Sequence, residues 1–347
     1  MAEIDLTRLG VDAPALLIAE ISANHDGDLD QALALVDLAA EAGWDCIKLQ
    51  TYDADSLTIR SDHPSHRIDP VWGHERLHDL YAAAGMPMAF HEPLFARARE
   101  RGLIPFTSIY DPRDLDFIEG LDPPIYKIAS FEMTFDDLLA AVAGTRKPII
   151  LSTGMADEAE IAHALEVLDR HGSGPVALLH CCSSYPAPPE AINLAAMATM
   201  RARFGRPVGF SDHTIGALAS VAAVAMGAVA IEKHVTNDMA RAGPDHRFSA
   251  TPTVMREIAE GVRAVHVMRG DGVKRPTEAE AASKAAGRRS AFALRDLPEG
   301  HLIEAGDFRF VRPSAGIAPN DPRGVRGRVT ARPVRAGHPI TAEDLVQ

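Results

Sequence analysis

The chain has 347 residues, 46% of them hydrophobic, and a formal net charge of −13 at pH 7. That length allows one large and one small domain with a full core, and the negative charge argues against nucleic acid or an anionic membrane as a partner. Three cysteines without zinc-type or redox spacing indicate reduced thiols. Because no apolar run has membrane length and the start does not resemble a signal peptide, we expect a cytoplasmic protein.

Eight short apolar segments are predicted as strands in the first three quarters of the chain. They are mostly unbroken, which is typical of parallel strands buried on both faces of a sheet. The predicted strands are Leu16–Ala19, Cys46–Leu49, Ile104–Phe106, Ile125–Ile128, Pro148–Leu151, Val176–Leu179, Val208–Phe210 and Ala228–Ile231.

Amphipathic segments lie between the predicted strands. They are Asp30–Ala42, Glu92–Arg101, Pro112–Gly120, Asp157–His171, Leu194–Phe204, Ile215–Met226 and Thr253–Met268. Eight β-α units in about 250 residues match a (β/α)8 TIM barrel, which we assign to residues 1–269. A doubly wound open sheet is the alternative, but it would commonly carry a glycine-rich nucleotide loop, and no such motif occurs.

Residues 52–85, between the second and third predicted strands, are too many for a simple loop. The segment contains several histidines and charged residues. Long excursions of this kind usually cap a site or contact a neighbouring subunit. We therefore expect one of these two roles here.

The C-terminal part differs from the rest of the chain in composition and pattern. Residues 270–286 are polar and read as a linker. Beyond them the pattern R-x-[LV]-x-x-G-H-x-I-x-x-x-D-[FL] occurs twice, from Arg295 to Phe308 and from Arg332 to Leu345. A repeat this short predicts a small β-rich domain with internal pseudo-symmetry over residues 287–347.

Two histidines follow neighbouring predicted strands, in Ser211-Asp212-His213-Thr214 and Glu232-Lys233-His234-Val235. Parallel α/β folds bind ligands at the carboxyl ends of their strands. Two imidazoles meeting there with carboxylates suggest a divalent metal, whereas the alternative is a pair of structural, hydrogen-bonded histidines. Local spacing leaves both interpretations open.

Lysines and hydroxyls also gather at the strand ends. Lys48, Lys127 and Lys233 provide positive charge there, which an acidic protein needs to bind a phosphate or carboxylate. Glu20, Glu232 and Asp245 are candidate bases. The other polar residues of this set are Gln50, Thr107, Ser130, Glu132, Ser152 and Ser211.

Several of these segments resemble one family, in order from about Leu16 to the C-terminus. The resemblance is to the sialic acid synthases, which comprise the N-acetylneuraminate, legionaminate and pseudaminate synthases. Residues 287–347 resemble the antifreeze-like (SAF) domain of that family. The segments that carry the resemblance are Ala19–His25, Ile47–Tyr52, Tyr126–Ser130, Leu151–Met155, Ser211–Thr214, Glu232–His234, Gly243–His246 and Arg312–Ile317.

The resemblance implies a transferase that condenses phosphoenolpyruvate with the open-chain aldehyde of an N-acetylated amino sugar. The products would be a nine-carbon 2-keto acid and phosphate. His213 and His234 would hold a divalent metal that polarises the aldehyde oxygen, with Mn²⁺ as the first choice and Mg²⁺ or Co²⁺ as alternatives. Lys48, Thr107, Lys127, Ser130, Ser152 and Ser211 would bind phosphoenolpyruvate, with Glu132 and Lys233 in the same substrate-binding set.

The resemblance also implies the remaining roles. Glu20 would contact the sugar or transfer a proton, with Gln50 and Tyr185 nearby, while Glu232 and Asp245 would position water. Arg312 would reach the sugar of the partner subunit in a homodimer whose SAF domains cap each other's active sites.

The closest similarity within the family is to the pseudaminate branch, carried by Ile21–His25, Lys48–Tyr52 and Trp72-Gly73 among others. The implied acceptor is 2,4-diacetamido-2,4,6-trideoxy-L-altrose. Ile109-Tyr110-Asp111 stands where the family usually has Pro-Phe-Asp. Alternatives are an N-acetylneuraminate or legionaminate synthase and a 3-deoxy-sugar-acid synthase. More remote are a metal-dependent aldolase and a non-catalytic carbohydrate-binding protein.

Overall fold

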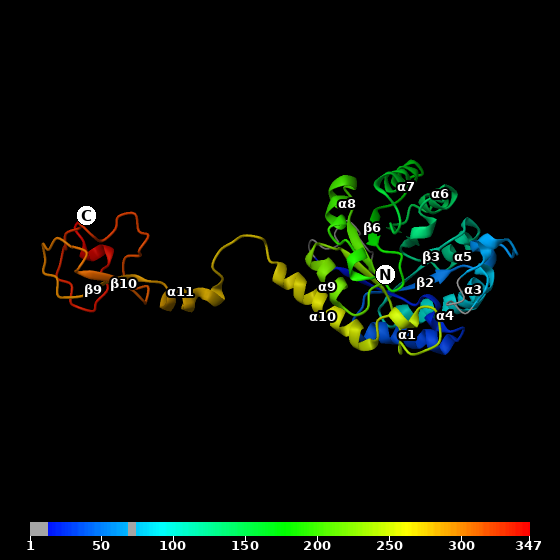
Figure 1. Cartoon of the computed structure of the whole chain (residues 1–347), viewed down its shortest axis with the longest axis horizontal. Helices are drawn as coiled ribbons and strands as arrows, with labels where there is room; N and C mark the ends of the chain where they lie inside the picture. Colours follow the sequence, from blue (N-terminus) through cyan, green and yellow to red (C-terminus); the bar gives the residue numbers. More distant parts are fainter. Residues whose placement is uncertain (1–12, 69–73) are drawn as a thin grey trace. The chain divides into compact units, whose positions relative to one another are not determined.

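The computed structural model describes residues 13–68 and 74–347, and the chain forms two compact units, Met1–Gly270 and Asp271–Gln347 (Figure 1). Trp72 and Gly73 lie outside the described residues. In the larger unit eight parallel strands pair in sequence order and close into a barrel. The strands are β1 (Leu16–Glu20), β2 (Cys46–Thr51), β3 (Ile104–Ile109), β4 (Tyr126–Ile128), β5 (Ile149–Ser152), β6 (Val176–Cys181), β7 (Val208–Asp212) and β8 (Ala230–His234).

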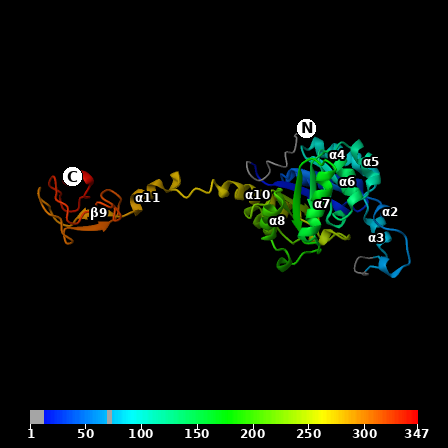
Figure 2. The ribbon, with the colours of Figure 1, turned by 90° about the horizontal axis from the view of Figure 1, so that it is seen from above.

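Helices surround this barrel, which confirms the predicted TIM-barrel fold (Figure 2). None of the described helices is long and apolar enough to cross a membrane. The helices of this unit are α1 (Leu29–Glu41), α2 (Ala54–Leu57), α3 (Leu77–Ala84), α4 (Met88–Glu100), α5 (Leu115–Gly120), α6 (Asp136–Gly144), α7 (Glu158–Arg170), α8 (Ala196–Phe204), α9 (Leu218–Ala225) and α10 (Pro252–Arg269).

Local capping explains where two of the longer helices begin. The Asp28 side chain accepts hydrogen bonds from the backbone N–H groups of Asp30 and Gln31 at the start of α1. At the start of α7, Asp157 and Glu160 form a reciprocal capping box. Both devices satisfy N–H groups that the first helical turn leaves without partners.

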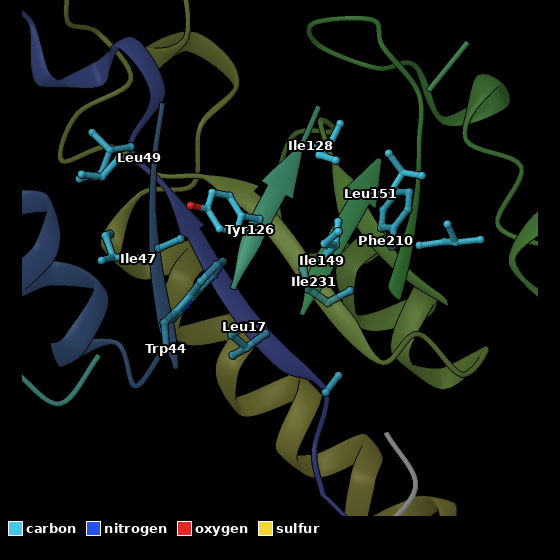
Figure 3. Close-up of a cluster of buried hydrophobic side chains, with 14 of the residues drawn as sticks. Leu17, Trp44, Ile47, Leu49, Tyr126, Ile128, Ile149, Leu151, Phe210 and Ile231 are labelled. Atoms are coloured by element: carbon cyan, nitrogen blue, oxygen red, sulfur yellow. The ribbon is translucent and has the colours of Figure 1, made fainter. Parts of the chain in front are cut away.

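Side chains alternate between the two faces of each barrel strand. In β2, Ile47 and Leu49 pack outward in the core between strands and helices (Figure 3). Cys46 belongs instead to the smaller core inside the barrel, with Phe106, Ile150 and other residues. Because the period of a strand is two residues, Lys48 and Gln50 face the same way as Cys46. This alternation decides which strand-end residues can meet inside the barrel mouth.

The smaller unit confirms the predicted pseudo-symmetry. Equivalent residues of the two repeats pair across it: the N–H of Leu297 donates to the carbonyl of Val334 at 2.8 Å, and the reverse bond is 2.9 Å. In each copy the first arginine bonds the last aspartate, Arg295 to Asp307 at 2.7 Å and Arg332 to Asp344 at 2.6 Å. The elements are α11 (Ala281–Gly287), which falls within the predicted linker and extends one residue beyond it, and the antiparallel strands β9 (Ser290–Ala293) and β10 (Phe308–Val311).

Candidate active site

A cavity of about 510 Å³ lies at the carboxyl ends of the barrel strands. It brings together most of the residues that the sequence singled out, although they are spread over more than 200 positions of the chain. Those that line it are Glu20, Lys48, Gln50, Lys127, Ser130, Glu132, Ser152, Tyr185, Ser211, His213, Glu232, His234 and Asp245.

The floor of the cavity is a ring with one inward-facing side chain from each strand. Strand register places several of these residues directly beside one another; for example, Ser108 lies beside Lys127, and Ser211 beside Glu232. Below the ring, apolar side chains fill the barrel. The ring residues are Glu20, Lys48, Ser108, Lys127, Ser152, Cys181, Ser211 and Glu232, and all of them except Ser108 line the cavity.

Two buried lysines and two buried carboxylates form the charged part of this ring. Lys48 Nζ pairs with Glu20, lies 3.8 Å from Glu232 Oε1 and donates to Ser108 Oγ at 3.0 Å. Lys127 Nζ lies 3.9 Å from the same Glu232 oxygen. Burial lowers the pKa of Lys48 to about 7, since desolvation disfavours the ammonium, although Glu232 opposes the shift. Burial would raise the pKa of Glu232, but the two ammonium groups hold it below its ordinary value.

Hydroxyl and backbone donors lie next to these charges. Ser130 Oγ accepts a hydrogen bond from the N–H of Gly154 at 3.0 Å and lies 3.2 Å from the Cys181 sulfur. Ser211 Oγ donates to Glu232 at 3.2 Å. A Cβ on Gly154 would come within 2.3 Å of Ser183 Oγ, so only glycine leaves this space open. Lysines and hydroxyls together are suited to a phosphate or carboxylate.

The histidine pair also lies in the cavity, with ring centroids 5.6 Å apart. His213 Nδ1 donates to the carbonyl of Cys182 at 2.8 Å, which leaves the lone pair on Nε2. Burial lowers the pKa of His213 and takes that of His234 well below its ordinary value, so both rings are neutral at pH 7. The buried Nδ1 of His234 lies 3.6 Å from Asp245 and has no hydrogen-bond partner in the part of the chain that the structure describes.

These features fit a metal held by two imidazoles, because neutral histidine is the ligating form. Within residues 13–68 and 74–347, no group of three or more histidine, cysteine, aspartate or glutamate side chains is arranged around one metal position. A metal bound here would therefore complete its coordination with water or substrate oxygens.

Asp245 connects the histidine pair to the loop after β1. Its Oδ2 accepts a hydrogen bond from Ser22 Oγ at 2.6 Å. The next residue, His246, bonds Asp26 Oδ1 at 2.9 Å, and Arg241 bonds the other oxygen of Asp26 at 2.8 Å. These contacts fix the loop after β8 against the loop after β1, and burial raises the pKa of Asp245.

Two predicted site residues of the barrel unit do not line the cavity. Thr107 faces outward from β3, where its hydroxyl bonds that of Thr51 at 2.7 Å. Lys233 also faces outward and pairs with Asp212 at 3.0 Å, so two lysines rather than three face the mouth. The placement of Lys233 follows from the two-residue period of a strand, because Glu232 and His234 on either side of it line the cavity. Arg312 belongs to the smaller unit.

Other residues line the cavity without having been predicted. Tyr52, Tyr81 and Tyr110 do so, as does an apolar wall from residues 54–84, consistent with the expectation that this excursion caps a site. Ser22 and Cys181 also belong to the lining. Side chains alternate between inward and outward along β3 and β6, and this alternation could have identified Ser108 and Cys181 as inward-facing. No local pattern marks the tyrosines.

Fold and site together define a class of protein. A TIM barrel whose mouth holds two lysines, hydroxyl donors and a histidine pair has the architecture of an enzyme for anionic small molecules. The family can also be named. The chain belongs to the NeuB family, whose model matches residues 35–274, and an SAF domain model matches residues 288–346.

Full-length relatives agree with this assignment. The pseudaminic acid synthase of Campylobacter jejuni is 33% identical over 343 residues, 99% of this chain and 100% of that protein. The N,N'-diacetyllegionaminic acid synthase of the same species is 34% identical over 87% of this chain and 92% of that protein. The crystal structure of the N-acetylneuraminic acid synthetase from Leptospira borgpetersenii has a TM-score of 0.70 and 31% identity, covering 78% of this chain and 90% of that one. The chain is therefore an enzyme, a transferase of the sialic acid synthase type.

Proposed function

We propose that the enzyme condenses phosphoenolpyruvate with the open-chain aldehyde of an N-acylated amino sugar. C3 of phosphoenolpyruvate bonds to the aldehyde carbon, water adds at C2, and the bond from C2 to the phosphate oxygen breaks. The products are a nine-carbon 2-keto acid and phosphate. The observation that carries this proposal is that one cavity contains both a set of lysines and hydroxyls suited to anions, which we call the anion-binding half, and a histidine pair.

The anion-binding half supports a substrate with both phosphate and carboxylate. Lys127, Ser130, Ser152 and Ser211 would bind these groups, and the N–H of Gly154 would hold the Ser130 hydroxyl in place. Because the cavity floor is buried, each ammonium interacts with an anion more strongly than it would in water. Lys48, whose pKa is lowered to about 7, can exchange a proton with Glu20 or Glu232 without leaving its place.

His213 and His234 would hold a divalent metal, Mn²⁺ in our proposal, which would supply Lewis-acid polarisation of the aldehyde oxygen. Glu20 and Gln50 would contact the sugar, and Tyr185 would lie over the histidine pair, its ring centroid 4.3 Å from that of His213. Glu232 and Asp245 would orient the attacking water, since both carboxylates line the cavity, Glu232 buried and Asp245 partly buried.

For the acceptor we propose 2,4-diacetamido-2,4,6-trideoxy-L-altrose, which would make the enzyme a pseudaminic acid synthase. The apolar lining from Leu57, Ile68, Leu77 and Leu80 supports a sugar with a C6 methyl group and acetyl methyls. The full-length similarity to a pseudaminic acid synthase supports the same branch. We further propose a cytoplasmic homodimer in which Arg312 of each SAF domain reaches the partner's cavity.

Phosphate release from phosphoenolpyruvate, measured with Mn²⁺ present, tests the proposal. The acceptors compared are the L-altrose compound, its 2,4-diacetamido-2,4,6-trideoxymannose counterpart and N-acetylmannosamine. We expect the highest kcat/KM with the L-altrose compound, and loss of release after chelation. No release with any acceptor would overturn the synthase assignment, and a preference for another acceptor would move the enzyme to the legionaminate or neuraminate branch.

His234→Ala serves as the control for the metal. This variant should lose Mn²⁺ binding and phosphate release while its circular dichroism stays that of the wild type. Full activity in the variant would contradict the metal assignment but leave the acceptor comparison intact.

A further inference from the structure

Tyrosine is unevenly distributed in this molecule. The chain has five tyrosines, and Tyr52, Tyr81, Tyr110 and Tyr185 all line the cavity. Tyr185 lies over the histidine pair, whereas the other three form a separate cluster. The Tyr52 ring meets Tyr81 edge-on at 6.1 Å between centroids and Tyr110 at 5.2 Å. None of the three has a role in the proposed condensation.

Glu132, at the end of a short helical turn after β4, lines the same cavity as this cluster. Its Oε2 atom is buried and has no hydrogen-bond partner among the described residues. Burial raises the pKa values of Tyr81 and Tyr110, and the nearby Glu132 carboxylate raises both further. The two phenols are therefore neutral and keep their O–H groups as donors. Burial also raises the pKa of Glu132 to about 7, so an N–H donor there would favour its charged form.

Apolar side chains complete this part of the lining. Leu57, Leu77 and Leu80 belong to α2 and α3 or their ends, and Ile68 lies between those helices in the chain. One carboxylate acceptor, two phenol donors and an apolar wall thus occur together. A secondary amide with a methyl group presents the matching chemistry, namely an N–H donor, a carbonyl acceptor and an apolar end. A sugar hydroxyl offers neither the carbonyl nor the methyl.

We propose that Glu132, Tyr81 and Tyr110 form an amide subsite that binds the second acylamino group of a diacylamino sugar. Glu132 accepts the amide N–H, the phenols donate to the carbonyl, and the leucines contact the methyl. Tyr52 is a positioning residue that holds the two other rings. The inference rests on the proposed function.

The test compares an acceptor that carries a second acetamido group with one that does not. Kinetics are measured for 2,4-diacetamido-2,4,6-trideoxy-L-altrose and for N-acetylmannosamine, in the wild type and in Tyr81→Phe and Tyr110→Phe. Each substitution removes one hydroxyl and keeps the ring. We expect the ratio of kcat/KM for the diacetamido sugar over N-acetylmannosamine to fall about tenfold in each variant, mainly through the acceptor KM.

Tyr126→Phe is the matched control. The fifth tyrosine lies in the outer core, where its hydroxyl donates to Glu119 at 2.5 Å, so its loss should leave the ratio unchanged. Thermal unfolding of each variant checks that the fold is kept. A wild-type ratio in both Tyr81→Phe and Tyr110→Phe, or equal losses on both acceptors, overturns the subsite alone. No phosphate release by the wild type with either sugar overturns the proposed function and the subsite with it.

Discussion

At the scale of single residues, strand parity separates the predicted strand residues that line the cavity from those that do not. Glu232 and His234 face the cavity, so Lys233 between them must face outward. The two-residue period alone predicts this, and the sequence interpretation overlooked it. Thr107 is different: nothing in its short apolar strand shows which face is inside until the register with β2 and β4 is known.

Neighbouring hydroxyls on β3 should respond differently to removal. Ser108→Ala takes away the acceptor for the Lys48 ammonium, so we expect kcat/KM for phosphoenolpyruvate to fall about tenfold. Thr107→Val removes an outward hydroxyl that bonds Thr51, so the expected effect is about 1 kcal/mol of stability with kcat/KM nearly constant. Steady-state kinetics and urea unfolding of both variants provide the comparison. The reverse pattern would show that Thr107 faces the substrate.

At the scale of elements, the strands were easier to predict than the helices. Every predicted strand is confirmed, because each is an apolar run that both faces of a barrel wall must bury. The sequence interpretation missed α6, which is short and follows a turn containing Phe135. It also left residues 52–85 without elements, although α2 and α3 there build the cavity wall.

Gly209 on β7 shows how tightly the strands pack inside the barrel. A Cβ at this position would lie 2.6 Å from the Ala230 carbonyl oxygen and 2.7 Å from Leu179 Cδ2. Gly209→Ala should therefore lower the free energy of unfolding by about 1–3 kcal/mol through overpacking. Gly144→Ala, at the end of α6 with open space around the new atom, is the control and should stabilise by a few tenths of a kcal/mol up to about 1 kcal/mol. Equal stability of Gly209→Ala and the wild type in urea unfolding would contradict this account.

At the scale of the whole molecule, two units of different construction share one chain. The barrel has a large apolar core, whereas the smaller unit buries few apolar residues and depends for its stability on the pairing of its two repeats. Asp307 is 2% exposed and accepts from the N–H of Glu304 at 2.8 Å, from Arg295 at 2.7 Å and from His301 at 2.7 Å if that ring nitrogen is protonated. The first of these bonds, with help from the others, holds the pKa of Asp307 far below its ordinary value.

This lowered pKa predicts how the stability of the smaller unit depends on pH. A carboxylate whose folded-state pKa is depressed stabilises above its unfolded pKa of about 3.9, and this stability is lost as the pH falls below that value. Calorimetry of the full chain between pH 6 and pH 3 should show the transition of the smaller unit falling toward acid. In Asp307→Asn, the smaller unit should be less stable than in the wild type at pH 6, and its transition temperature should depend less on pH. Glu299→Gln, at an exposed position of the same unit, is the control, and an unchanged acid slope in Asp307→Asn would contradict the prediction.

The sequence by itself determined the barrel and the repeat through their hydrophobic period, the family through its motifs, and the charged residues of the cavity lining through their positions at strand ends. It also placed His213 and His234 beyond consecutive strands, where they do meet. Only the tertiary structure decided that Thr107 faces outward and that Tyr81, Tyr110 and Glu132 line the same cavity. The physical reason is that barrel closure fixes register and inward parity around all eight strands at once, and that the excursion between β2 and β3 supplies part of the cavity wall.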